Sequence, residues 1–267
     1  MSIRPHPFFS GALFARKSCF VYLPDDYETS EEPYPVIYLL HGMYGSESHW
    51  LLKGNAESTL NRMMQEGSLR KSIVVFPNDG GYGLGTFYMN WYDGTGNFED
   101  YFIYDLAKEI DKSFRTVPDR AHRVLCGLSM GGFGAFSLAL RHSELFGAAA
   151  SLSGAVTSTA MITNQYSRSD ISRMIGPLHG PYAQSYDLQK LAEAQLTNSQ
   201  RPALYFNCGT EDYLYSMNAA YHEHLERIGY QHIYQEFPGE HNWDYWSEHL
   251  PDALRFLEAS FQQMTDK

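Results

Sequence analysis

The stretch Arg123-Val-Leu-Cys-Gly-Leu-Ser-Met-Gly-Gly-Phe-Gly-Ala135 decides how this chain is interpreted. It passes from an apolar run typical of a buried strand into a helical pattern, and it contains Gly127-x-Ser129-x-Gly131 at the junction. A serine on such a sharp turn needs small residues two positions before and two positions after it, because the chain folds back on itself. The stretch therefore predicts a nucleophile elbow that presents Ser129 at the end of a strand. The alternative interpretation is a glycine-rich turn with an idle serine.

The segments around the elbow repeat its order of strand and helix. Nearly continuous apolar runs occupy residues 36–40, 73–76, 124–126, 148–152 and 203–206, and a further strand is expected at 233–237. Helical patterns occupy residues 56–66, 98–114, 130–141, 216–228 and 243–264. Continuous apolar runs are typical of parallel strands that helices cover on both faces. We expect one α/β domain over residues 1–267, with a mostly parallel, doubly wound sheet.

Two segments depart from this alternation. The first 35 residues are predicted to form an antiparallel hairpin at the edge of the sheet. Residues 155–200 are polar, with one short helical stretch at 188–194. A long insertion after a strand of a doubly wound sheet lies over the ligand crevice, so this segment is interpreted either as a lid or as an ordinary surface excursion.

A serine hydroxyl needs a base and an orienting carboxylate before it can attack an ester. In proteins with such an elbow these partners follow in the order Ser, Asp or Glu, then His. Asp212 lies on a turn after one predicted strand, and His241 lies on a glycine-introduced loop after the next. Glu211 and Asp244 compete with Asp212 for the acid role. His249 competes with His241, but it is expected on the surface of the last helix.

The remaining requirement is an oxyanion hole, because negative charge develops on the carbonyl oxygen in the transition state. The strand at 36–40 runs into His41-Gly-Met-Tyr-Gly45. We expect the backbone N–H groups of Met43 and of Met130, the residue after Ser129, to form this hole.

Aromatic residues near these loops are the candidates for substrate contacts. Tyr44 follows the expected oxyanion amide, and Trp243 lies two residues after His241. A glycine-rich loop at 80–85 continues into an expected aromatic rim that consists of Tyr82, Phe87, Tyr88 and Trp91. Tyr44, Trp91 and Trp243 are the predicted substrate-binding residues, although buried packing is the common alternative for such side chains.

Composition excludes several other functions. The 20 Lys and Arg against 31 Asp and Glu give a net charge of −11, which makes nucleic acids and anionic membranes unexpected partners. The three cysteines, Cys19, Cys126 and Cys208, form neither a disulfide framework nor a zinc motif. His222 and His224 lie two residues apart and would face different directions on a helix, so neither a metal site nor a cofactor is expected.

Localisation and assembly are less constrained by the sequence. No apolar stretch is long enough for a membrane span, and the N-terminus lacks the residue order of a signal peptide. The cytoplasm is therefore the expected compartment. A homo-oligomer is left open.

Four motifs together resemble a known family: Leu39-Leu-His-Gly-Met43, Gly127-Leu-Ser-Met-Gly-Gly132, Gly209-Thr-Glu-Asp212 and Gly239-Glu-His-Asn-Trp243. Over residues 15–260 the chain resembles the Putative esterase branch of the α/β-hydrolases, which includes tributyrin esterases, feruloyl esterases and S-formylglutathione hydrolases. The resemblance implies the α/β-hydrolase fold, a triad of Ser129, Asp212 and His241, and oxyanion amides from Met43 and Met130. S-formylglutathione hydrolases carry a Thr-Cys pair in the loop after the oxyanion strand, whereas this chain has Met43-Tyr44. The glutathione thioester is therefore a less expected substrate than an oxygen ester.

We predict a serine carboxylesterase that hydrolyses small-molecule, short-chain or small aromatic acyl oxygen esters through an acyl-enzyme on Ser129. An acyltransferase with the same triad and an S-formylglutathione hydrolase-type thioesterase are the alternatives. A hydrolase-like binding module would usually have lost a triad residue, and all three are present. Short, uncharged or weakly charged esters are expected to react faster than long-chain lipids, because nothing in the chain suits a lipid interface. These short esters are also expected to react faster than S-formylglutathione, because the net charge of the protein disfavours an anionic thioester.

Overall fold

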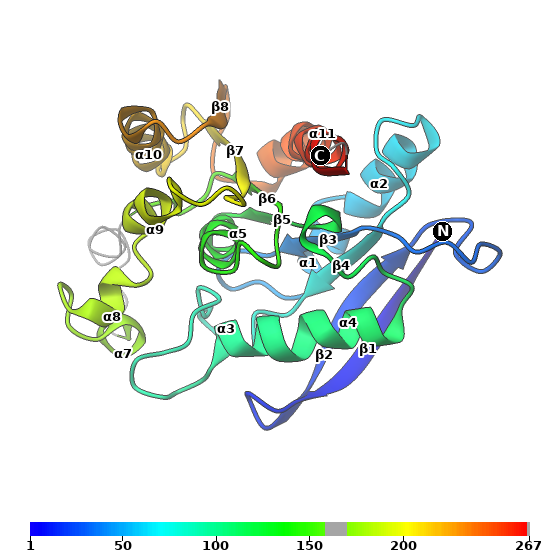
Figure 1. The fold of residues 1–267 in the computed structure, drawn as a ribbon, viewed down its shortest axis with the longest axis horizontal. Coiled ribbons are helices and arrows are strands. Elements are labelled where there is room, and N and C mark those ends of the chain that lie inside the picture. The colour runs from blue at the N-terminus through cyan, green and yellow to red at the C-terminus, as the bar shows by residue number, and fades with distance from the viewer. Residues whose placement is uncertain (158–169, 266–267) are drawn as a thin grey trace.

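A computed structural model describes residues 1–157 and 170–265 of the chain. In this part of the chain an eight-stranded sheet forms the centre of the fold (Figure 1). Its strands are β1 (Ser2–Ser10), β2 (Ala15–Leu23), β3 (Val36–Leu40), β4 (Ile73–Pro77), β5 (Arg123–Leu128), β6 (Ala148–Leu152), β7 (Ala203–Gly209) and β8 (His232–Phe237). Their spatial order is β1-β2-β4-β3-β5-β6-β7-β8.

Strands β3 to β8 are parallel, as the sequence predicts. Every residue of β3, β4 and β6 is buried, which explains why their sequences are continuously apolar and do not alternate. The predicted edge hairpin is also confirmed. Strand β1 pairs antiparallel with β2 from Ser2 opposite Leu23 to Ser10 opposite Ala15, and β2 pairs antiparallel with β4.

Helices cover both faces of the sheet (Figure 1). The helical segments are α1 (His49–Leu52), α2 (Ala56–Gln65), α3 (Phe98–Asp100), the π-helical turn η1 (Tyr101–Leu106), α4 (Ala107–Ser113), the 3₁₀ turn η2 (Arg120–His122), α5 (Met130–Arg141), α7 (Ile171–Ile175), α8 (Pro181–Gln184), α9 (Leu188–Gln195), α10 (Tyr215–Ile228) and α11 (Trp243–Thr265). Each predicted helix is present. The expected helix at 98–114 runs through α3, η1 and α4 without a break.

Side chains that alternate along the strands divide the core into two layers. Tyr38 and Leu40 pack on one face with α3, η1, α4, α5, α9 and α10. Ile37 and Leu39 pack on the other face with α1, α2 and α11. The two predicted helical layers therefore enclose β3 from both sides.

The position of β3 in the sheet determines where a ligand can approach. Strand β3 lies between β4 and β5, so the chain leaves β3 toward one neighbour and later returns to the other. A crevice opens at the carboxyl ends of the strands at such a switch point. The loop after β3 and the elbow after β5 both border it.

The described part of the predicted lid is an ordered helical layer. The predicted short helix is α9, and it packs against α5. Residues 158–169, which the prediction also includes, lie outside the described residues.

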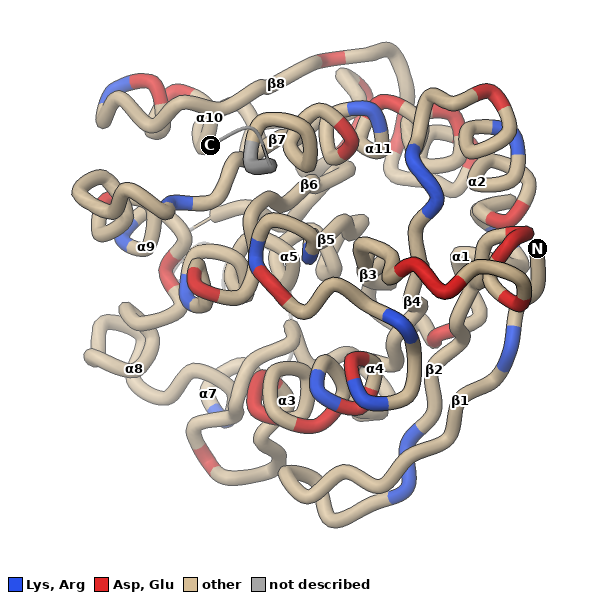
Figure 2. Tube along the Cα trace, turned by 45° about the vertical axis from the view of Figure 1, so that its right-hand side comes forward, with Lys and Arg blue, Asp and Glu red and all other residues tan. Residues whose placement is uncertain are grey.

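Charged residues are distributed over the whole fold, and no basic stripe forms in the part of the chain that the structure describes. In Figure 2 both red and blue positions lie on α4, which carries Lys108, Glu109, Asp111 and Lys112. None of the helices in the described residues combines the length and the apolar character needed to cross a membrane.

Candidate active site

Ser129 occupies the sharp turn that its sequence predicts. It is the residue before α5, its backbone has φ 53° and ψ −119°, and it is 7% exposed. A side chain at Gly127 would place its Cβ 2.1 Å from the carbonyl oxygen of Gly131. A side chain at Gly131 would place its Cβ 2.5 Å from the carbonyl oxygen of Leu40. The two glycines are therefore required by close backbone approach, as an elbow requires.

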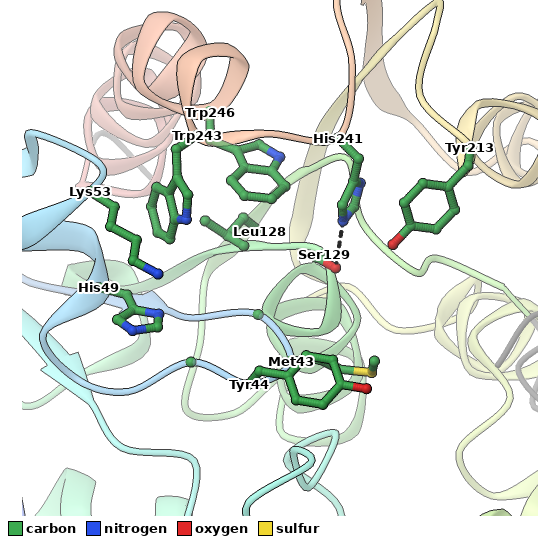
Figure 3. Close-up of a pocket in the computed structure, with 12 residues that line it drawn as sticks. Met43, Tyr44, His49, Lys53, Leu128, Ser129, Tyr213, His241, Trp243 and Trp246 are labelled. Atoms are coloured by element: carbon green, nitrogen blue, oxygen red, sulfur yellow. Dashed lines mark hydrogen bonds between the residues drawn. The ribbon is translucent and has the colours of Figure 1, made fainter. Parts of the chain in front are cut away.

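His241 joins Ser129 to Asp212. Its Nε2 atom lies 2.9 Å from Ser129 Oγ (Figure 3). Its Nδ1 atom lies 2.8 Å from Asp212 Oδ2. A carboxylate accepts only, so Nδ1–H donates to Asp212 and Nε2 is left to accept the Ser129 hydroxyl proton. This order of contacts orients a base toward a serine hydroxyl.

The second oxygen of Asp212 is also satisfied, because Oδ1 accepts the N–H of Leu214 at 2.7 Å. Glu211, the neighbouring candidate, instead accepts the N–H of Gly239. It thereby ties the loop after β7 to the loop that carries His241. Asp244, the other candidate acid, is exposed on α11.

The expectation that His249 lies on the surface is wrong. Its ring is buried and stacks on Phe237 with a centroid distance of 4.1 Å. Its Nδ1 atom lies 3.0 Å from Asp252 Oδ2. His249 therefore packs α11 against β8, because a histidine on a long helix faces the sheet when its position coincides with the apolar stripe.

The loop after β3 is held in place by His41. Nε2 of His41 accepts the N–H of Asp79 at 3.2 Å, and Nδ1–H donates to the carbonyl oxygen of Gly42 at 2.8 Å. Tyr44, two residues after Gly42, has a left-handed φ of 57°. Met130 is the first residue of α5, where a helix does not use its own N–H groups. The assignment of the Met43 and Met130 amides as an oxyanion hole stays a prediction.

A cavity of about 240 Å³ opens beside Ser129. Its lining comes from the loop after β3, from α1 and the residue after it, from the elbow, from the loops after β7 and β8, and from the start of α11 (Figure 3). The lining residues are Gly42, Met43, Tyr44, Gly45, His49, Lys53, Leu128, Ser129, Tyr213, His241, Trp243 and Trp246. No described residue between 170 and 200 is among them.

Two of the three predicted substrate-binding residues, Tyr44 and Trp243, line this cavity. Trp91 does not. It is 3% exposed, and its indole N–H donates to the carbonyl oxygen of Thr86 at 3.2 Å. Phe87 and Tyr88 are fully buried as well. The prediction of an aromatic rim is therefore wrong for these three residues, because the left-handed backbone at Phe87 and Tyr88 accompanies a turn whose side chains lie in the core.

Sequence reasoning missed several residues of the cavity. Tyr213 packs against the His241 ring with a centroid distance of 4.5 Å, and Trp246 contacts the same ring edge-on at 4.9 Å. Tyr213 directly follows Asp212, and Trp246 lies one helical turn after Trp243, so adjacency to the triad was the available signal. His49 begins a helix of a single turn and Lys53 caps its end, and one turn is too short to give a periodic pattern.

Other reactive groups are separate from this site. Cys126 is buried three positions before Ser129, and burial raises the pKa of its thiol, as it does for Cys208. His222 forms a hydrogen bond with His232 at 2.8 Å. Within residues 1–157 and 170–265, no group of three His, Cys, Asp or Glu side chains is placed to hold a metal ion.

Comparison with known proteins places this chain in a family. The family described as Putative esterase matches residues 10–257. An acetyl esterase of Caldicellulosiruptor saccharolyticus is 25% identical over 273 residues, which covers 96% of this chain and 98% of that protein.

Solved structures show the fold. A ferulic acid esterase superposes with a TM-score of 0.82 at 26% identity, over 97% of this chain and 98% of that one. A substrate-bound Staphylococcus aureus fluorophosphonate-binding serine hydrolase F superposes with a TM-score of 0.83 at 22% identity, over 96% and 98% of the two chains. The predicted α/β-hydrolase fold is thereby confirmed.

Proposed function

The chain belongs to the Putative esterase family, and from that membership we propose that it is a serine carboxylesterase with Ser129 as nucleophile, His241 as base and Asp212 as orienting acid. The observation that carries the proposal is the continuous hydrogen-bond path through these three side chains, with contacts of 2.9 and 2.8 Å. A base within hydrogen-bond reach of a serine, itself oriented by a buried carboxylate, is the arrangement that activates a hydroxyl.

The reaction proceeds in two halves. As Ser129 Oγ attacks the ester carbonyl carbon, its proton passes to His241 Nε2, and Asp212 stabilises the resulting imidazolium. The C–O bond to the alcohol then breaks, and His241 returns the proton to the departing alkoxide. Water repeats the sequence on the acyl-enzyme: His241 takes a water proton, hydroxide adds to the acyl carbon, and Ser129 leaves with the proton.

The backbone amides of Met43 and Met130 would stabilise the oxyanion in both halves. Removal of one donor from such a hole costs about 10²–10³ in kcat in other enzymes. The hydrogen bonds of His41 hold the Met43 side of the hole, so the loop needs little rearrangement during the reaction.

The size of the cavity supports small acyl groups. A volume of about 240 Å³ is below the ~300–1,000 Å³ of pockets that enclose drug-sized ligands. Tyr44, Tyr213 and Trp243 offer aromatic faces around it, which suits a short aliphatic or small aromatic acyl group. The acetyl esterase and the ferulic acid esterase among the similar proteins are consistent with substrates of that size.

The exposed aromatic residues that border the cavity of the proposed nucleophile favour hydrolysis over transfer to another alcohol. Tyr44 and Tyr213 at the mouth are 64% and 55% exposed, and no described residue of the segment after β6 lines the cavity. An acyltransferase must instead exclude water from its acyl-enzyme.

The experiment is a comparison of kcat/KM across a panel of esters. Acetyl, butyryl and feruloyl esters should be hydrolysed faster than C12–C16 esters and S-formylglutathione. Ser129→Ala should abolish all hydrolysis, whereas Ser113→Ala, a change of an exposed serine on α4, should leave it unchanged. Residual turnover in Ser129→Ala, or a preference for C12 and longer chains, would contradict the proposal.

A further inference from the structure

One end of the cavity carries two basic side chains that the proposed ester hydrolysis does not use. His49 and Lys53 line the same cavity as Ser129. In Figure 3 they lie beside Trp243, on the side of Ser129 away from Tyr213. We name this end of the cavity, formed by His49, Lys53 and Trp243, the basic end.

Local structure fixes the two basic residues side by side. His49 begins the single turn of α1 and Lys53, four positions later, follows its last residue, where the N–H of Lys53 donates to the carbonyl oxygen of His49 at 2.9 Å. Residues at this spacing share one face of a helix. Trp50, the buried residue that follows His49, donates its indole N–H to the carbonyl oxygen of Leu40 at 3.0 Å. This bond attaches α1 to the strand that leads into the predicted oxyanion loop.

Trp243 closes the basic end against α1. A Cβ at Gly54 would lie 2.8 Å from both the Trp243 and the Trp50 rings, so a glycine is needed for these rings to meet the turn. His49 contacts Trp243 edge-on with a centroid distance of 6.2 Å. The basic end is therefore bordered by packed aromatic surface.

The charge of the cavity is opposite to that of the chain. None of the cavity's lining residues is an aspartate or glutamate, although the chain has 31 such residues against 20 Lys and Arg. Lys53 forms no ion pair with any carboxylate of the described residues within 4.0 Å. Glu47, the acidic residue near α1, is hydrogen-bonded to Ser18 and Asn78.

The electrostatics of His49 agree with a positive charge close to it at this end. Burial and, after it, the nearby Lys53 ammonium lower the pKa of His49, whereas the Glu47 carboxylate raises it. A lowered pKa favours the neutral imidazole, which has one N–H to donate. The basic end thus offers a full positive charge on Lys53 and a hydrogen-bond donor on His49, with no acidic side chain among the residues that line the cavity.

We propose that the basic end binds a carboxylate of the substrate, so that the favoured esters carry one carboxylate a short spacer away from the scissile bond. The inference rests on the proposed function and narrows its substrate class. A cavity lined by charge of one sign concentrates ligands of the opposite sign even when the net charge of the protein disfavours them. Local charge at the basic end therefore outweighs the repulsion that the net charge of −11 predicts for small anionic esters.

Two matched pairs of esters test this with the full chain. In 3-acetoxypropanoate and 3-acetoxypropanamide the charge lies in the alcohol part, and in monomethyl succinate and methyl succinamate it lies in the acyl part. The members of each pair have nearly the same shape, so the ratio of their kcat/KM values isolates the charge. The pair that shows the preference identifies which part of the ester reaches the basic end.

The wild-type chain should prefer the carboxylate in at least one pair by about two- to fivefold, the range of an exposed ion pair. Lys53→Met should bring that ratio close to one, Lys53→Arg should keep it, and Lys53→Glu should favour the amide. Lys112→Met, which removes an exposed charge on α4, should leave the ratio unchanged. About 0.5 M salt should reduce the preference, because charges that are partly exposed are screened.

The outcomes separate this inference from the proposed function. Equal rates within both pairs, or a preference that persists in Lys53→Met, would overturn the carboxylate site while leaving the esterase intact. Hydrolysis of 4-nitrophenyl acetate without turnover of either pair would also overturn the inference alone. If no ester were hydrolysed at all, both the carboxylate site and the proposed esterase function would be contradicted.

Discussion

The backbone of Ser129 is held in a conformation that costs about 1–3 kcal/mol for a residue with a side chain. Its N–H donates to the carbonyl oxygen of Leu152 at 3.0 Å, and its carbonyl oxygen accepts the N–H of Ala155 at 3.0 Å. Both partners belong to the end of β6 and the loop after it. The neighbouring strand therefore fixes the hydroxyl where His241 reaches it, and the geometry of the candidate site depends on these backbone contacts as well as on the triad side chains.

A single-atom change at Asp212 tests the role assigned to its carboxylate. Asp212→Asn should lower kcat by about 10⁴, because an amide at this position favours the wrong tautomer of the His241 ring. Steady-state kinetics with a short-chain ester measures the effect. Glu211→Gln is the matched control, since a glutamine oxygen can still accept the N–H of Gly239. A large loss in Glu211→Gln together with a small loss in Asp212→Asn would reassign the acid.

At the scale of elements, the elbow joins β5 to α5 through contacts that leave no space for extra atoms. The Cβ of Gly127→Ala would lie 2.1 Å from a backbone oxygen, and backbone cannot move away as a flexible side chain can. We expect this variant to lose several degrees or more in Tm, or to fail to fold, with activity lost in parallel. Gly83→Ala is the control, because a Cβ added at Gly83 would have no other atom within 4 Å. Thermal unfolding followed by circular dichroism compares the Tm values of the two variants. An unchanged Tm in Gly127→Ala would show that the elbow tolerates side chains.

The regular elements, and the proximity of Ser129, His241 and Asp212, could be predicted from the sequence because their signals are local or periodic. The strand runs are continuous where both faces are buried, α2, α9 and α11 are amphipathic, and Ser129, Asp212 and His241 each follow a predicted strand. The parallel register then brings the three loops to one end of the sheet.

The residues that were misassigned depend on tertiary packing. Phe87, Tyr88 and Trp91 follow a glycine-rich loop, which suggested exposure, yet their turn directs them into the core. His249 lies on the helix face that meets β8. Lys53 is positioned at the cavity through Trp50, whose hydrogen bond to a strand residue ten positions earlier has no sequence signature.

At the scale of the whole molecule, Glu99 connects three segments that are distant in sequence. The carboxylate of this α3 residue is buried and contacts Arg141 at 2.8 Å, His142 at 2.6 Å and the Tyr186 hydroxyl at 2.5 Å. Burial alone would raise its pKa, but the hydrogen bonds from these partners lower the pKa of Glu99 to about 2. The cluster holds the segment that contains α8 and α9 against α5.

This lowered pKa predicts a specific loss of stability in acid. A group whose pKa is lower in the folded state stabilises the protein fully above its unfolded value, here about 4.5, and loses that contribution as the pH falls toward about 2. The expected contribution of Glu99 is on the order of 2–3 kcal/mol. In urea unfolding, Glu99→Gln should lower the free energy of unfolding strongly at pH 7 and less at pH 3.

The matched control is Glu66→Gln, since Glu66 forms an exposed ion pair with Arg62 at 3.5 Å. The free energy of unfolding of this variant should lie within about 0.5 kcal/mol of the wild-type value at both pH values. A deficit for Glu99→Gln that is the same at pH 7 and pH 3 would contradict the linkage.

The central claim is that Ser129 is the nucleophile of an esterase, and covalent labelling with a fluorophosphonate tests it most directly. Intact-mass spectrometry should show one added phosphonyl group per chain, and peptide mapping should locate it on Ser129, with loss of ester hydrolysis in proportion to labelling. His241→Ala should label far more slowly, because the serine then lacks its base. Labelling of a different residue, or full hydrolytic activity in a chain whose Ser129 is completely labelled, would contradict the account.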